Sequence, residues 1–292
     1  MQLVVNALIA GSLAALIAGG LSLVYGTLGV FNLALGQMVL IGGYVTWWLH
    51  QVTDLPLVVS IAGGLGVGAM ISWATFELFV EPFWKRHRFL PLVTTIALSM
   101  MLDGMILLLF EERPRAILPG LKGSFPFFGA RVNDTQITLI VVTLLLLSGF
   151  AFILHSTPFG RKLRAVVQHP HAAESLGINA PKINRLIFIL SGMLAACGGI
   201  YQGIDQNLTP TLAFPITIKA YAAIIAGGKG HFWGTILCAY LIALLEQLAI
   251  GVPWFGGTYI GAGYQQTVAL AVIIVFLLLK PNGLFGSSIR SA

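Results

Sequence analysis

The sequence predicts an all-helical protein that crosses a membrane many times. Of its 292 residues, 57% are hydrophobic and 9% are charged, whereas a soluble globular domain carries about 25% charged residues. Mean hydropathy is +0.91. Glycine is abundant, at 34 residues, and small residues let membrane helices pack closely. We therefore predict a polytopic membrane protein, folded as a single domain over residues 1–292, with about eight full spans plus broken or short helices.

Apolar runs of about 17–25 residues mark the membrane-spanning helices. They lie at 3–25, 55–79, 91–110, 137–155, 185–204, 232–250 and 264–280. Two shorter stretches, 37–50 and 216–228, are expected to be halves of broken helices. Because both are flanked by glycines and fall in corresponding halves of the chain, we take an inverted repeat as a hypothesis. The first run has no Lys or Arg before it, so it is interpreted as a retained span rather than a signal peptide.

The orientation is predicted from Lys and Arg in the short loops, which favour the cytoplasm. EPFWKRHRF (81–89) and the loop at about 156–184 are basic, and the tail carries Lys280 and Arg290. All three segments can lie in the cytoplasm together. This puts the N-terminus outside if residues 37–50 cross the membrane. The loop at about 111–136 would then be external, although it also holds four basic residues.

Residues 24–44, VYGTLGVFNLALGQMVLIGGY, place polar side chains and glycines inside an apolar region. Breaking a helix there frees backbone groups, which is tolerated only where protein or water satisfies them. Asn32, Gly36 and Gln37 suit such a break beside a polar cavity. Thr94, Thr95 and Ser99 form a hydroxyl face in the span at 91–110. The alternatives stay open: Asn32 in a glycine-rich packing seam, and hydroxyls bonded to their own helix.

Two carboxylates fall within spans, Asp103 and Glu246. An intramembrane carboxylate is a functional candidate by default. No Lys or Arg shares the span of either residue, so structural hydrogen bonding is favoured for both. The alternative for Glu246, close to a helix end, is contact with water. The glycine pairs Gly64/Gly68 and Gly199/Gly203 are interpreted as seams of close helix packing.

The sequence does not favour an enzyme, and no catalytic residue, metal site or cofactor is assigned to the chain. GGKGHFWGT resembles a phosphate-binding loop, but Ala223 and Gly230 replace the glycine and the Ser or Thr that such a loop needs. His169 and His171 lack metal-ligand spacing with any Cys or acid. The net charge of +6 is spread over short loops, so membrane lipid is an expected partner and nucleic acid is not.

The loop at about 156–184 carries an ordered series of helix signals. Thr157-Pro158 begins a helix that runs toward Pro170, HAAESLG then ends at Gly177 as a C-cap, and Asn179 is an N-cap for the return helix. A short helix of small residues projecting from a loop is suited to dock on another protein. The alternative is a solvated connector, which needs no such succession of starts and stops.

Several spaced motifs resemble the permeases of bacterial ABC importers for branched-chain amino acids, most closely the shorter of the two permease types. The resemblance covers nearly the whole chain. It rests on YGTLGVFNLALG (25–36) with GGY (42–44), TPFGRKLRA (157–165), AAESLGIN (172–179), AGGKGHFWGT (226–235) and KPNGLFG (280–286). Importers of urea, short-chain amides and some aromatic acids share these motifs, so such solutes are the alternative substrates.

The resemblance implies a permease of the bacterial inner membrane that pairs with a second, related permease. Two cytosolic ATPases, which bind ATP and Mg²⁺, and a periplasmic binding protein complete the importer. The implied translocation path includes Tyr25 and Asn32 with Gly36 and Gln37, and family members often carry an acid where this chain has Gln37. The implied coupling helix maps onto Ala172, Ala173, Glu174, Ser175, Leu176 and Gly177.

The mechanism expected from these features is alternating access driven by ATP hydrolysis on the partner subunits. The alternative from another class is a stand-alone secondary carrier. Such a carrier needs intramembrane charge relays or ion ligands. Asp103 and Glu246 are few residues for such a relay.

Overall fold

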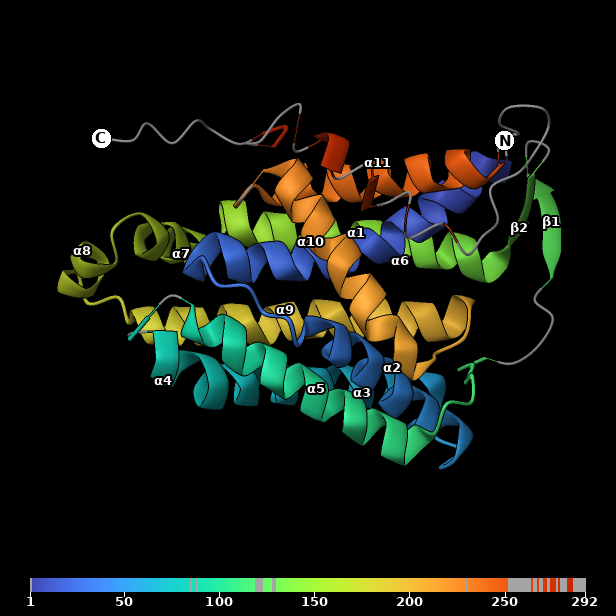
Figure 1. The fold of residues 1–292 in the computed structure, drawn as a ribbon, viewed down its shortest axis with the longest axis horizontal. Helices are drawn as coiled ribbons and strands as arrows, with labels where there is room; N and C mark the ends of the chain where they lie inside the picture. Colours follow the sequence, from blue (N-terminus) through green and yellow to red (C-terminus); the bar gives the residue numbers. More distant parts are fainter. Residues whose placement is uncertain are drawn as a thin grey trace.

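The computed structural model describes residues 2–84, 86–87, 89–118, 123–127, 130–228 and 230–251, together with isolated positions between 264 and 285. The described part is an elongated bundle of helices (Figure 1). Most of the predicted span at 264–280 and of the motif at 280–286 lies outside the described residues.

The described helices agree with the predicted all-helical membrane class. The long ones are α1 (Gln2–Leu28), α2 (Leu35–Gln51), α3 (Leu57–Thr75), α5 (Leu90–Phe110), α6 (Asp134–Ser156), α9 (Ala180–Asp205), α10 (Ala213–Gly227) and α11 (Phe232–Gly251). A π-helical segment, Phe76–Val80, joins α3 to α4 (Glu81–Trp84). Two shorter helices, α7 (Pro158–Gln168) and α8 (Pro170–Ser175), lie between α6 and α9.

Each predicted span on described residues corresponds to a helix long and apolar enough to cross a membrane, and 7 such helices occur in the described part. One of them was underestimated from the sequence. The stretch predicted as a short segment at 216–228 begins earlier, with a 3₁₀ turn at Pro210–Leu212, and reaches 18 residues by Gly227. Pro210 and Pro215 make the start of this helix look like a loop, although a proline is tolerated in the first turn of a helix.

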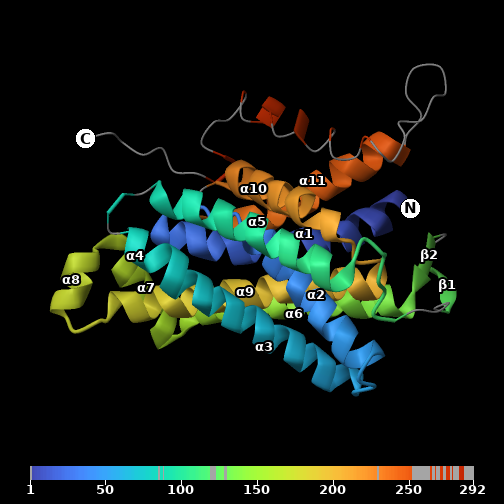
Figure 2. The same ribbon diagram turned by 60° about the horizontal axis from the view of Figure 1, so that its bottom comes forward.

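The bundle has two distinct ends. Helices α4, α7 and α8 lie at one end, called here the α8 end (Figures 1 and 2). The start of α1 and a β-hairpin lie at the other, called the hairpin end. Strands β1 (Ser124–Phe127) and β2 (Ala130–Asn133) pair antiparallel. The side chain of Gln2 bonds the backbone N–H of Arg131 at 2.8 Å, which ties α1 to the hairpin.

The hairpin was not predicted. Each strand has only four residues, and the surrounding loop has no long alternation of apolar and polar residues. An isolated two-stranded hairpin is marginally stable in water, so this one depends on contacts such as those between Gln2 and Arg131 that the local sequence does not reveal.

Helix α9 lies at the centre of the bundle, against α1, α2 and α3 (Figure 1). Glycines make this packing possible. A Cβ at Gly199 would lie 1.7 Å from the backbone oxygen of Val39 on α2, and a Cβ at Gly64 would lie 2.7 Å from that of Gly42. The structure therefore confirms that Gly64/Gly68 and Gly199/Gly203 lie in seams of close packing, because a Cβ at Gly68 or Gly203 would also meet a neighbour within 3 Å.

Candidate functional site

The segment around Asn32 is a break between two helices. Helix α1 ends at Leu28 near the α8 end, and residues 29–34 lead back to α2, which begins within the bundle (Figure 1). Gly29 has a φ of +65°, a backbone conformation that glycine adopts without steric cost. The predicted interruption of the helix is confirmed at this position.

Thr95 satisfies backbone groups of this break. Its fully buried hydroxyl donates to the Pro91 carbonyl at 2.8 Å and accepts from the N–H of Leu33 at 3.4 Å. Thr95 therefore bonds both to its own helix, α5, and to the irregular segment. The interpretation that this hydroxyl bonds its own helix is confirmed, and its place on a solute path stays a prediction.

Asn32 is completely buried. Its Oδ1 accepts the N–H of Ala34 at 3.1 Å, a local turn that prepares the start of α2. Phe31, next to it, packs against Tyr25 with ring centroids 4.6 Å apart and against Tyr221 at 5.3 Å. Protein atoms thus enclose Asn32, and its Nδ2 has no hydrogen-bond partner in the described part of the chain.

Gln37 and Asp103, distant in sequence, meet in the structure. The Nε2 of Gln37 donates to Oδ1 of Asp103 at 3.1 Å, and Gln37 is 1% exposed. The structural hydrogen bond favoured for Asp103 is present. An acid at position 37 would face a second carboxylate, whereas the amide of Gln37 supplies a donor.

The other predicted path residues make different contacts. A Cβ at Gly36 would lie 2.1 Å from Oγ1 of Thr217, so Gly36 lets α2 approach α10. Thr94 donates to the carbonyl of Phe79 in the π-helical segment, and Ser99 is half-buried on α5. The place of these seven residues on a solute path stays a prediction.

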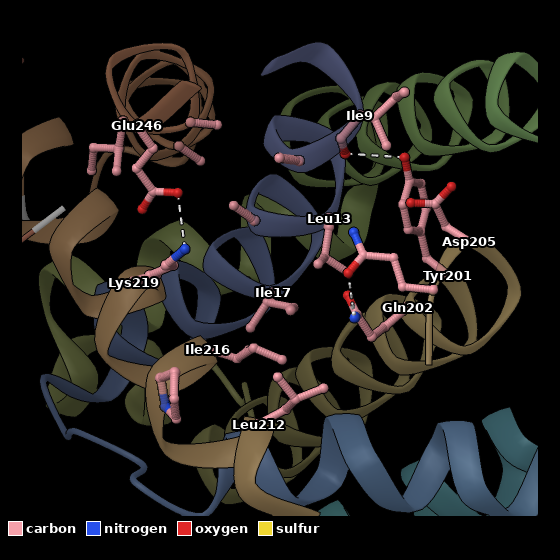
Figure 3. A pocket seen from close by; sticks show the side chains of 17 residues that line it. Ile9, Leu13, Ile17, Tyr201, Gln202, Asp205, Leu212, Ile216, Lys219 and Glu246 are labelled. Carbon is pink, nitrogen blue, oxygen red and sulfur yellow. Dashed lines mark hydrogen bonds and ion pairs between the residues drawn. The ribbon is translucent and has the colours of Figure 1, made fainter. Parts of the chain in front are cut away.

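A cavity of about 370 Å³ lies elsewhere, between α1, α9, α10 and α11 (Figure 3). None of the seven predicted path residues lines it. Its apolar lining includes Ile9, Leu13 and Ile17 of α1, together with Ile216 of α10. Its polar lining comprises Tyr201, Gln202, Asp205, Gln206, Lys219 and Glu246.

Lys219 and Glu246 form an ion pair on one wall of the cavity (Figure 3). Nζ of Lys219 lies 2.9 Å from Oε2 of Glu246, whose side chain is only 3% exposed. The structural bonding favoured for Glu246 is therefore present. Its basic partner, Lys219, lies on the neighbouring helix α10. Only basic residues within the span of Glu246 were considered from the sequence, so this partner was not identified there. The available signal was Lys219 itself, a charge within the apolar helix AFPITIKAYAAIIAG.

The facing wall, on α9, carries polar groups held by hydrogen bonds (Figure 3). Asp205 accepts from Nε2 of Gln136 at 3.1 Å. The hydroxyl of Tyr201 donates to the carbonyl of Ile9 at 3.0 Å, and Nε2 of Gln202 donates to Oε1 of Gln206 at 3.2 Å. The cavity therefore has charged or polar groups on two walls and apolar side chains between them.

The loop that joins α6 to α9 forms the α8 end, and its predicted helix signals are confirmed. Thr157 accepts from the N–H of Gly160 at 3.3 Å as the N-cap of α7. Gly177 has a φ of +78° just after α8, and Asn179 accepts from the N–H of Lys182 at 2.9 Å as the N-cap of α9.

The predicted coupling residues differ in exposure. Ala173 is 2% exposed and packs α8 onto the protein, whereas Leu176 is 80% exposed at the tip of the loop. The remaining four are exposed: Ala172, Glu174, Ser175 and Gly177. Arg164 of α7 donates to the carbonyls of Leu154 and His155 at the end of α6, which holds the loop against the bundle.

Comparison with known proteins identifies the family. A family model described as "Branched-chain amino acid transport system / permease component" matches residues 3–279. The chain belongs to this family. It is a multi-pass membrane protein and a transport component rather than a catalytic one.

Relatives cover nearly the whole chain. A high-affinity branched-chain amino acid transport system permease protein, BraD of Pseudomonas aeruginosa, is 29% identical over 98% of this chain and 95% of its own length. A probable branched-chain amino acid transport permease protein, LivH of Methanocaldococcus jannaschii, is 30% identical over 96% and 91%. The ribose import permease protein RbsC of Escherichia coli is 25% identical over 93% and 83%.

A solved structure shares the fold. PsaBC from Streptococcus pneumoniae, in complex with Fab, aligns with a TM-score of 0.50 and 15% sequence identity, covering 97% of this chain and 93% of that one. The two proteins therefore share a fold at low sequence identity.

Proposed function

We propose that this chain is the permease subunit of an ABC importer for branched-chain amino acids. It forms half of the translocation path, and ATP is hydrolysed on separate subunits. The observation that carries the proposal is the family match across residues 3–279. Relatives named as branched-chain amino acid permeases, at 29% and 30% identity, support this solute. The ribose permease, at 25%, shows that related chains are named for other solutes.

The proposed partners are a second, homologous permease, two cytosolic ATPases and a periplasmic binding protein. The support within this chain is the loop at the α8 end, where α8 projects with Leu176 exposed. Three helix caps order this loop, so it can move as a rigid body when the ATPases close. The permease then changes between its two states because the docked loop has different contacts in each.

We place the chain in the inner membrane with the α8 end in the cytoplasm. Helix α4, which ends two residues before Arg86, and helix α7, which carries Arg161, Lys162 and Arg164, lie at that same end. Lys and Arg are favoured in cytoplasmic loops. The start of α1 and the hairpin are then external.

The proposal is tested by affinity purification of the tagged chain in mild detergent, with mass spectrometry of the proteins that co-purify. We expect two ATPase subunits and a sister permease. Recovery of the chain alone, with solute transport in proteoliposomes that hold no ATP, would contradict the proposal and favour a secondary carrier.

A further inference from the structure

The cavity between α1, α9, α10 and α11 lies in the half of the bundle toward the hairpin end. Asp205 is the last residue of α9, and its carboxylate bonds Gln136 in the first turn of α6, directly after β2. Ile9 lies near the start of α1, and Glu246 near the end of α11. In the proposed orientation, a solute from outside would meet this cavity first.

The ion pair on its wall is costly to maintain at this depth. A charged side chain within a membrane span is costly to insert, and such residues mark substrate or ion pathways. Nζ of Lys219 lies 2.9 Å from Oε2 of Glu246, so the two charges offset each other in part. The ammonium of Lys219 has three N–H donors, and this contact uses one of them, so the cation retains capacity for another acceptor.

The shape and chemistry of the cavity define its ligand. Its volume of about 370 Å³ is within the range of small-molecule sites, about 300–1,000 Å³. We infer that it binds an α-amino acid with an apolar side chain in its zwitterionic form. The carboxylate of the ligand accepts from Lys219, its ammonium donates to Glu246, and its side chain packs against Leu13, Ile17 and Ile216. This inference rests on the proposed function and names the site within it.

The ion pair selects a zwitterion over other solutes. An anion satisfies Lys219 but repels Glu246, and a cation does the reverse. A ligand with both charges side by side leaves the net charge of the wall unchanged and adds charge-assisted hydrogen bonds, which are about twice as strong as neutral ones. A sugar has no charge to place against either residue, and it would leave its hydroxyls facing Leu13 and Ile17.

The first experiment measures occupancy directly in the assembled complex. Cys197 and Cys238 are replaced by Ala, and Ile216→Cys is labelled with a small charged thiol reagent. L-leucine should slow the labelling several-fold, whereas 4-methylpentanoate, which lacks the ammonium, and isoamylamine, which lacks the carboxylate, should leave the rate unchanged. An unchanged rate with L-leucine, or equal slowing by all three compounds, overturns the inference.

The second experiment separates a binding role of the ion pair from a packing role. Lys219→Met with Glu246→Gln removes both charges but keeps the size of the side chains. We expect normal assembly with the ATPases and a rise of about tenfold or more in the KM for leucine uptake, the loss expected for a charge-assisted hydrogen bond. The matched control is Arg185→Met with Glu77→Gln, which neutralises an ion pair near the α8 end that does not line the cavity.

The outcomes separate this inference from the proposed function. If the wild-type complex takes up no leucine, the proposed function fails. If the wild-type complex transports leucine and the neutral Lys219/Glu246 variant keeps the same KM, only the site assignment is overturned. An equal rise in KM for the Arg185/Glu77 control also overturns it, because the effect would then not belong to this cavity.

Discussion

At the scale of single residues, two pairs of intramembrane polar side chains bond across neighbouring helices. Gln37 bonds Asp103 across α2 and α5, and Lys219 bonds Glu246 across α10 and α11. The sequence indicates that these residues are special, because polar groups are rare in spans. It does not indicate the pairs, since 66 residues separate the first two and 27 the second.

We predict that the amide of Gln37 is required for full stability of the folded protein, because it faces Asp103. Gln37→Glu replaces a donor by a second carboxylate, so we expect the folded protein to lose about 1–3 kcal/mol of stability. Adding Asp103→Asn restores a donor beside the new acid and should recover most of the loss. Thermal unfolding in detergent measures both variants, and equal unfolding temperatures for Gln37→Glu and wild type would contradict this role.

At the scale of elements, the helix starts and stops followed from local chemistry. Thr157, Gly177 and Asn179 act through neighbours within three or four residues, so the sequence alone located α7, α8 and the start of α9. The hairpin was missed because its support comes from Gln2, 129 residues from Arg131. The cavity was missed for the same reason, since four helices far apart in the chain build its walls.

The seam between α2 and α9 predicts a large effect of one methyl group. Gly199→Ala places a Cβ 1.7 Å from the backbone oxygen of Val39, so the helices must separate, at a cost of about 1–3 kcal/mol. The control Gly149→Ala on α6 meets nothing within 4 Å and should be neutral or stabilise by about 0.5–1 kcal/mol. Thermal unfolding in detergent compares them, and equal effects would refute the close packing.

The exposed tip of the α8 loop predicts a coupling defect without a folding defect. Leu176 is 80% exposed, so Leu176→Glu should leave the permease folded while removing an apolar docking contact. We expect uptake, and the ATP hydrolysis stimulated by the loaded binding protein, to fall by about tenfold or more. The control Val52→Glu, 54% exposed in the turn between α2 and α3, should retain both activities. Normal uptake by Leu176→Glu would exclude a coupling role for this tip.

At the scale of the whole molecule, the polar and basic loops sort into two ends joined by apolar helices. The composition predicted the membrane class, and the apolar runs predicted the spans, because the hydrocarbon core fixes both the polarity and the length of a spanning helix. The arrangement of α10 across the bundle depends on tertiary contacts with α1, α2 and α11, which no local pattern encodes.

This arrangement predicts opposite accessibility at the two ends. A cysteine introduced at Ser175, in α8, should react with an impermeant thiol reagent only after the membrane is opened. A cysteine at Thr53, exposed after α2, should react from the periplasmic side of spheroplasts. Labelling of both positions from one side would contradict the orientation.

The most direct test of the transport function is uptake of labelled L-leucine by proteoliposomes that contain the complex purified through this chain. The binding protein is added outside, and ATP with Mg²⁺ is either enclosed or omitted. We predict that leucine accumulates only when ATP is enclosed. Accumulation without ATP, or accumulation driven by an ion gradient, would contradict an ATP-driven importer.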